Sequence, residues 1–295
     1  MSYDFQYRAS GKWILCGEHS VIRGAPAIAF PFKHKQLNLN YEHTKLPITA
    51  EFSGNAGEDL HLLFWSVIEK GLELLNINRS QITGHLKINN QLPIGTGLGA
   101  SAALSVAVSQ WLIHLQLLEP SLCFEFSKQL ENLFHKKSSG LDIACSMSEH
   151  GVLFQEGNIT PLKPRWHPIW ALSFSGSVGI TSHCVKKVET LLRQSPTLGA
   201  ELDDQMGNSV HLAAKALSQS KSEQSFNMLQ QAITQACDCF KQWQLINADV
   251  QSHLDLLTDK GAKAVKPTGS GSGGFVLSLW EQKPPEDLKK ILIMV

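Results

Sequence analysis

The residues best suited to hold a ligand form a glycine-rich run at residues 93–103, PIGTGLGASAA. Glycine lets a backbone approach a ligand closely, and the first amides of a helix are unpaired donors at the positive end of the helix dipole. A chain of phosphates fits such a loop. No lysine follows the last glycine, so the run is not a GxxxxGK[ST] phosphate loop. Taken alone, it is also typical of a tight strand-to-helix turn packed by small residues.

Two further clusters lie near the ends of the chain. In residues 10–20, SGKWILCGEHS, Lys12 precedes a short apolar segment, and Glu18 and His19 follow it. An isolated lysine or glutamate is usually a solvated surface charge, so this cluster alone does not indicate a site. Residues 268–274, TGSGSGG, lie between two strand-like runs and contain more glycine than a flexible hairpin needs.

The elements that must position these residues are predicted from hydrophobic periodicity. Residues 82–88 alternate apolar with polar types, which is the pattern of a half-buried strand. Residues 98–118 are nearly all small or apolar, long enough for a membrane span, but their polar members favour a helix buried in a soluble core. Ser220 and Glu223 have the spacing of a capping box, and an apolar stripe from Phe226 to Trp243 then predicts a helix with one face in the core.

The three clusters, in this order, resemble the GHMP kinase family, named for galactokinase, homoserine kinase, mevalonate kinase and phosphomevalonate kinase. Within it the chain is most similar to the mevalonate kinases, whose first motif reads A-P-G-K, a short strand, G-E-H-[AS]-V and G-x-P-A-[IL]-A. Residues 9–12, 17–21 and 24–29 match those pieces, with Ser10 in place of the proline. The glycine run ending at Ala103 matches the second motif, and residues 266–274, KPTGSGSGG, match the third. The resemblance covers nearly the whole chain.

A further mevalonate-kinase pattern, E-x(3)-H-x(3)-S-G-x-D, is matched by Glu131, His135, Ser139, Gly140 and Asp142. The resemblance places Asp142 at the reacting hydroxyl with Lys12 beside it, and assigns Glu131 and Ser101 to Mg²⁺. The residue types suit these roles. A carboxylate can accept the proton of a hydroxyl, a lysine can hold that carboxylate ionised, and oxygen ligands suit Mg²⁺ on phosphates. The sequence leaves open whether Asp142 acts as a full base or mainly orients and polarises the hydroxyl.

The resemblance also assigns residues to the acceptor and to the nucleotide. Glu18, His19 and Thr181 match positions that line the acceptor pocket, and they include no arginine. The nucleotide phosphates are expected on Pro93, Gly95, Gly97, Leu98, Gly99, Ala100, Ser101, Ala102 and Ser139. Lys136 and Lys137, which with Ser138 replace a more usual Gly-Asn-Pro, add two charges close to where those phosphates are expected.

The resemblance implies an α+β, two-lobed GHMP kinase fold. Its ribosomal protein S5 domain 2-like N-terminal lobe is expected at residues 1–160, with the phosphate loop, and its ferredoxin-like α/β C-terminal lobe at residues 161–295. The implied cofactors are ATP and Mg²⁺. The implied reaction converts mevalonate to phosphomevalonate, a step of isoprenoid precursor synthesis. The alternatives are a kinase of phosphomevalonate or a sugar, and a catalytically silent metabolite sensor.

Composition narrows the class of partner. The 295 residues include 26 basic and 26 acidic side chains, so no net charge attracts nucleic acid or an anionic membrane. A small-molecule substrate is expected, and the family resemblance adds a homodimer. The first residues lack a secretory signal, so we expect a cytoplasmic protein. The six cysteines lack paired zinc-type spacing, which predicts reduced, mostly buried thiols.

Overall fold

The computed structural model describes residues 3–55, 57–134 and 138–295. The chain forms two compact units that are interleaved in sequence. The first comprises residues 1–12, 31–94 and 98–149, and the second comprises residues 13–30, 95–97 and 150–295. The expected lobe boundary between residues 160 and 161 stays a prediction.

The first unit is built on a mixed sheet, which contains both parallel and antiparallel strand pairs. Strand β4 (Thr83–Asn90) is antiparallel to β2 (Ala27–Pro47) and parallel to β3 (Thr49–Gly54). Strand β1 (Phe5–Cys16) also pairs with β2. Leu86 and Ile88 of β4 are buried while Lys87 between them is only half-buried, which confirms the alternation predicted for residues 82–88.

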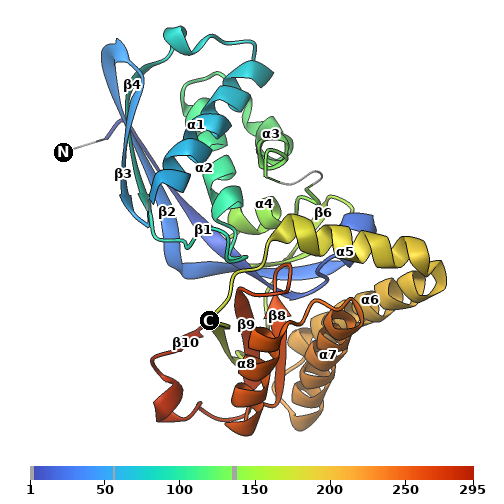
Figure 1. Cartoon of the computed structure of the whole chain (residues 1–295). Helices are drawn as coiled ribbons and strands as arrows, with labels where there is room; N and C mark the ends of the chain where they lie inside the picture. The colour runs from blue at the N-terminus through green and yellow to red at the C-terminus, as the bar shows by residue number, and fades with distance from the viewer. Residues whose placement is uncertain (1–2, 56, 135–137) are drawn as a thin grey trace. The chain divides into compact units, whose positions relative to one another are not determined.

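Helices cover one face of this sheet (Figure 1). They are α1 (Gly57–Leu74), α2 (Ala100–His114), α3 (Cys123–Glu131) and α4 (Leu141–Ser146). Helix α2 is buried along most of its length, as predicted. Ser109 donates a hydrogen bond of 2.8 Å to the Ser105 carbonyl and accepts one of 2.8 Å from Ser127 of α3, so the Ser109 hydroxyl is satisfied inside the core. Within the described ranges, no helix has the length and apolar character needed to cross a membrane.

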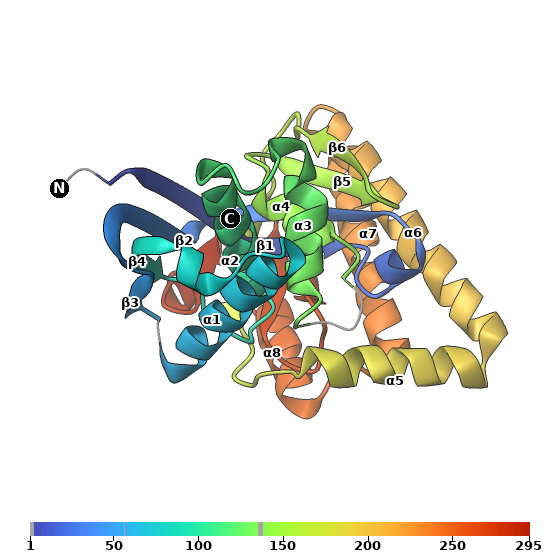
Figure 2. The ribbon, with the colours of Figure 1, turned by 90° about the horizontal axis from the view of Figure 1, so that it is seen from above.

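The second unit contains an antiparallel sheet and a set of long helices. The sheet order is β10 (Leu292–Met294), β7 (Ile169–Phe174), β9 (Phe275–Trp280) and β8 (Ala264–Thr268). Strand β5 (Gly151–Gln155) pairs with β6 (Asn158–Leu162) and with the first residues of β2. The helices are α5 (Thr181–Gln194), α6 (Pro196–Ser218), α7 (Glu223–Gln242) and α8 (Ala248–Asp259). Helices α6 and α7 lie side by side in both views (Figures 1 and 2). Short 3-10 helices lie at Ser20–Arg23 (η1), Arg79–Gln81 (η2), Pro120–Leu122 (η3) and Glu286–Leu288 (η4).

Helix α7 carries the apolar stripe predicted for it, but it begins differently. Its N-cap is Ser222, whose side chain accepts a hydrogen bond from the backbone amide of Ser225 while Ser225 reaches back to the N-cap amide. The expected box between Ser220 and Glu223 is wrong, because Glu223 is already the first helical residue. Two serines therefore make the reciprocal cap that a serine and a glutamate usually make.

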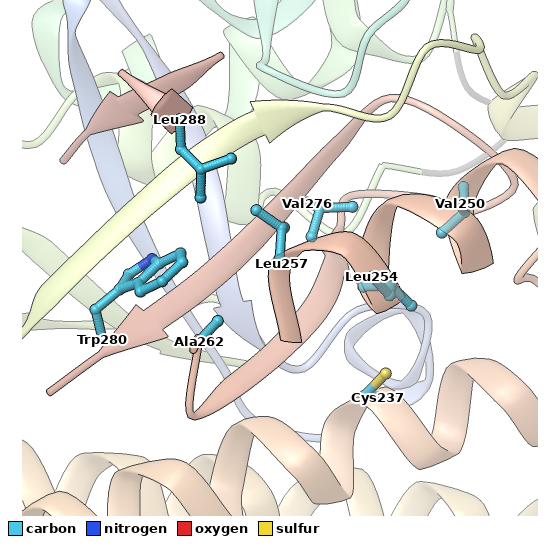
Figure 3. Close-up of a cluster of buried hydrophobic side chains, with 8 residues drawn as sticks. All are labelled: Cys237, Val250, Leu254, Leu257, Ala262, Val276, Trp280 and Leu288. Carbon is cyan, nitrogen blue, oxygen red and sulfur yellow. The ribbon is translucent and has the colours of Figure 1, made fainter. Parts of the chain in front are cut away.

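A hydrophobic cluster fixes strands β8 and β9 against the helices (Figure 3). Its buried members are Cys237, Val250, Leu254, Leu257, Ala262, Val276, Trp280 and Leu288. Each large apolar side chain that is fully buried contributes roughly 1.5–3 kcal/mol of transfer free energy. The glycine-rich segment that connects β8 to β9 is thereby held at both ends by packed strands. All six cysteines of the chain are unpaired and buried.

Candidate active site

A lysine and a carboxylate are paired in the first unit. Lys12 of β1 and Asp142, in the first turn of α4, lie 3.0 Å apart between Nζ and Oδ2, with side chains 4% and 25% exposed. Gly99 has a positive φ of 79°, and a Cβ added there would lie 2.8 Å from Cγ of Lys12. The last glycine of the loop thus leaves room for the lysine. The ammonium group is removed from water, whereas part of the carboxylate stays exposed.

Glu131, the last residue of α3, is a second buried carboxylate in this unit. It is 1% exposed, and its Oε2 accepts a short hydrogen bond from Ser138. Its Oε1 has no hydrogen-bond partner among the residues that the structure describes. Burial, and then the charge of Asp142, raises the pKa of Glu131 to about 8, while the Ser138 hydroxyl and Lys12 act in the opposite direction. A buried carboxylate oxygen without a partner is costly, so this atom is suited to a cation.

The oxygen donors of the first unit fit the Mg²⁺ assigned from sequence. Ser101 lies half-buried in the first turn of α2, just after the N-cap Gly99. A hydroxyl and a carboxylate are hard ligands, and Mg²⁺ usually takes only one or two protein ligands beside phosphates and water. A cation at Glu131 would also reverse the effect of burial on its pKa. Within residues 3–55, 57–134 and 138–295 no group of three or more His, Cys, Asp and Glu is placed to hold a metal ion.

The glycine run adopts backbone conformations that favour glycine. Gly95, Gly97 and Gly99 have φ values of 75°, 84° and 79°. Residues 95–97 belong to the second unit, where they line a narrow crevice with Gly179 and the glycine-rich segment after β8. A Cβ added at Gly274 would lie 2.7 Å from the Thr96 carbonyl oxygen. The high glycine content of residues 268–274 therefore has a packing reason, which is close approach of backbone to backbone.

The other residues predicted for the nucleotide differ in what they can offer. Leu98 and Ala102 are almost completely buried, so only their backbone could contact a ligand. Ser139 is half-buried and accepts a hydrogen bond of 3.2 Å from the Leu141 amide. Pro93 and Ala100 are half-buried. The predicted contributions of His135, Lys136 and Lys137 lie outside the described residues.

The acceptor residues predicted after β1 lie in a strained turn of the second unit. The Ser20 amide donates to the Glu18 carbonyl at 2.6 Å, which closes a γ-turn around His19. His19 has φ 59° and ψ −49° there, a rare conformation for a residue with a side chain. Asp203 of α6 anchors the next residues, because it accepts hydrogen bonds from Ser20 at 2.6 Å and from Arg23 at 2.6 Å. Such strain persists only where the surroundings fix it, and it is frequent at functional sites.

The His19 ring is held in one tautomer. Its Nε2 lies 2.9 Å from the Ser270 carbonyl oxygen, which can only accept, so Nε2 carries the proton. Burial is the main reason that the pKa of His19 is lowered to about 4. The ring is neutral near pH 7 and Nδ1 is an acceptor. Thr181, the first residue of α5, donates to the Ser270 hydroxyl at 3.3 Å, so Ser270 contacts two of the three predicted acceptor residues.

Sequence reasoning did not connect Lys266 with this site. Lys266 of β8 pairs with Glu18, and the two side chains are 0% and 1% exposed. The available signal was the position of Lys266 at the start of the third motif, but its partner lies 248 residues away in the sequence. The charge of Glu18 is therefore compensated inside the protein.

Comparison with known proteins agrees with the family resemblance of the motifs. Residues 63–150 match the family described as the GHMP kinases N terminal domain. The mevalonate kinase of Pyrococcus furiosus is 28% identical over 94% of this chain and 90% of that protein. The fold matches that of the L. major mevalonate kinase in complex with R-mevalonate, with a TM-score of 0.79 and 22% identity over 98% of this chain and 94% of that one. It also matches the Streptococcus pneumoniae phosphomevalonate kinase in complex with phosphomevalonate and AMPPNP, with a TM-score of 0.73 and 18% identity over 95% and 93%.

At 22% and 18% identity, the solved structures establish the fold alone. The sequence match to the Pyrococcus furiosus protein covers 94% of this chain. The expected α+β fold is confirmed. Residues 63–150 match the GHMP kinase N-terminal domain, and nearly the whole chain is similar to mevalonate kinases.

Proposed function

We propose that this chain is a mevalonate kinase, which transfers a phosphoryl group from ATP to a hydroxyl of mevalonate. The observation that carries the proposal is the ion pair of Lys12 and Asp142, in which the lysine is buried and the carboxylate is partly exposed. The relatives named mevalonate kinase, which match most of this chain, support the choice of acceptor.

In this proposal Asp142 receives the proton of the acceptor hydroxyl, or orients and polarises that hydroxyl, as phosphoryl transfer proceeds. Lys12 offsets the negative charge that gathers beside the carboxylate. ATP would supply the phosphoryl group when bound, and Mg²⁺ would offset negative charge on its phosphates. Glu131 and Ser101 would hold the cation, and the backbone amides at the start of α2 would face the phosphates.

On the acceptor side, the neutral His19 offers Nδ1 as a hydrogen-bond acceptor to a substrate hydroxyl, and Thr181 offers its own hydroxyl. Both groups are bound through Ser270, so they are fixed before the substrate arrives. Glu18 shares the turn with His19. The homodimer implied by the family resemblance is part of the proposal, as is a cytoplasmic location.

The proposal is tested by ADP release, measured in a coupled assay with ATP and Mg²⁺ and four separate acceptors: mevalonate, phosphomevalonate, galactose and homoserine. We expect mevalonate to give the highest kcat/KM. Faster turnover of phosphomevalonate would reject the acceptor and leave the kinase class. Binding of mevalonate without release of ADP would favour the metabolite sensor instead. Light scattering of the same preparation tests the dimer.

A further inference from the structure

The third sequence motif, residues 266–274, has no ligand assigned to it, yet it contacts each predicted acceptor residue. Lys266 pairs with Glu18, and Ser270 binds both His19 and Thr181. All of these residues belong to the second unit. The motif therefore supports the acceptor residues, in addition to packing against the glycine run.

Lys266 is completely buried, and its ion pair with Glu18 offsets the cost of burying its charge. Its ammonium group is fully buried and contacts the Glu18 carboxylate, the Ile14 carbonyl oxygen at 3.4 Å and the ring of Phe240, whose centroid is 5.4 Å away. Burying two charges costs so much solvation that a pair of apolar side chains is often at least as stable. Stability alone is thus a weak reason for this pair.

The backbone around the pair is also fixed. The Ile14 amide donates to the Thr268 hydroxyl at 2.9 Å, and that hydroxyl donates back to the Ile14 carbonyl at 2.9 Å. This reciprocal contact joins β8 to the end of β1, just before the turn that carries Glu18 and His19. These hydrogen bonds fix the distance between β8, which carries Lys266, and the end of β1. Lys266 therefore contacts the Glu18 side chain from a fixed position.

The strained turn needs such support on every side. The ring of His19 is held by Ser270 and packs at 5.2 Å from Trp243, and Ser20 is held by Asp203. The remaining residue of the turn is Glu18, and its side chain is held by Lys266. Without that anchor the backbone at His19 can relax toward a common conformation, which would move the imidazole.

We propose that Lys266 is a positioning residue for acceptor binding, which acts through Glu18 to hold the turn that presents His19. Lys266 has no exposed surface, so it affects the acceptor without contacting it. The inference rests on the proposed function in that it takes His19 and Thr181 as acceptor residues. It goes further by giving the third motif a role in acceptor affinity.

The test is a double-mutant cycle with Lys266→Met, Glu18→Gln and the double variant, in which KM is measured for mevalonate and for ATP. We expect each single variant to raise KM for mevalonate about 10-fold or more and to leave KM for ATP within about 2-fold. The double variant should be no worse than the worse single variant, because both act through one pair. Lys263→Met is the matched control, since Lys263 is 47% exposed in a surface pair with Glu281 and should behave as wild type.

Additive effects in the cycle, or equal effects on both substrates, would overturn the inference. If Lys266→Met alone does not fold, comparison of Glu18→Gln with the double variant decides, because a further 10-fold loss for mevalonate would show that Lys266 acts independently. A purely structural role would lower the melting temperature without changing KM for mevalonate selectively.

Lys266→Arg, which keeps the charge, should recover part of the acceptor affinity. If the wild type uses another acceptor, the proposed function fails, and the same cycle with that acceptor still tests Lys266.

Discussion

Replacement of Asp142 by Asn is the most direct test of the proposed chemistry. The amide keeps the shape of the side chain and some of its hydrogen bonding, but it removes the negative charge. Lys12, whose side chain is 4% exposed and whose Nζ lies 3.0 Å from Asp142, then loses its counter-ion. The variant therefore changes two quantities, the rate of phosphoryl transfer and the stability of the first unit.

The magnitudes follow from the geometry. Two unit charges 3.0 Å apart attract with roughly 5–6 kcal/mol at an effective dielectric constant of about 20. Asp142 is 25% exposed, so water screens the pair, and we expect a loss of about 2 kcal/mol in unfolding free energy rather than the roughly 3–5 kcal/mol of a fully buried pair. A positioned proton acceptor contributes about 10²–10⁴ in rate, so kcat should fall at least about 10²-fold.

The assay compares kcat and KM for both substrates at a temperature well below the melting point of the variant. ATP binding should survive, because Asp142 is assigned to the hydroxyl and not to the nucleotide. Asp204→Asn, at an exposed position of α6, is the control for the chemical change itself. Turnover by a folded Asp142→Asn protein at close to the wild-type rate would refute the catalytic assignment.

Three further outcomes are expected. Glu131→Gln and Ser101→Ala should both raise the Mg²⁺ concentration needed for activity, the first more strongly because it removes an anionic ligand, and unchanged titration curves would contradict the pairing. Mevalonate should exceed phosphomevalonate by about 10-fold or more in kcat/KM, because Lys266 is already paired with Glu18 and an added phosphate finds no other cation among these acceptor residues. Because the pKa of His19 is lowered to about 4, the unfolded chain binds more protons than the folded one between about pH 4 and 6.5. Unfolding free energy should therefore fall by about 3 kcal/mol as the pH drops through that window, and His19→Gln, but not the exposed control His167→Gln, should flatten the dependence in urea titrations.

Local patterns were sufficient to predict the elements around the first glycine run. The alternation of residues 82–88 and the small, apolar composition after Leu98 correspond to β4 and α2. The alternation arises because β4 buries one face, and the apolar composition arises because α2 is buried almost completely. Both kinds of burial determine the residue types along the sequence. The start of α7 was predicted less well, because Ser225 takes the position that glutamate usually has in a capping box.

Contacts between distant segments could not be predicted from such patterns. The partner of Lys266 lies 248 residues away, and the chain enters each unit more than once. The family motifs indicated which segments matter, but they gave no reason for the density of glycine after β8. The reason is the close approach of Gly274 to the Thr96 backbone, which depends on the packing of the whole second unit.

Ser138 differs from the family pattern, but it makes a contact that is compatible with the expected role of Glu131. Ser138 stands where the family pattern usually has proline, and its hydroxyl donates to Oε2 of Glu131. This bond lowers the cost of a buried carboxylate and leaves Oε1 available. The replacement thus keeps the oxygen that a cation would need.

Three carboxylates, Glu18 in the second unit and Glu131 and Asp142 in the first, differ in how their charge is compensated. Glu18 has Lys266 in direct contact, and Asp142 has Lys12 at 3.0 Å. Glu131 instead has a hydroxyl on one oxygen, and burial together with the charge of Asp142 raises its pKa to about 8. The two lysine-bound carboxylates have their counter-ions from the protein itself, whereas ionised Glu131 would gain most from an added positive charge. For this reason Glu131 is the carboxylate at which Mg²⁺ would be expected to bind.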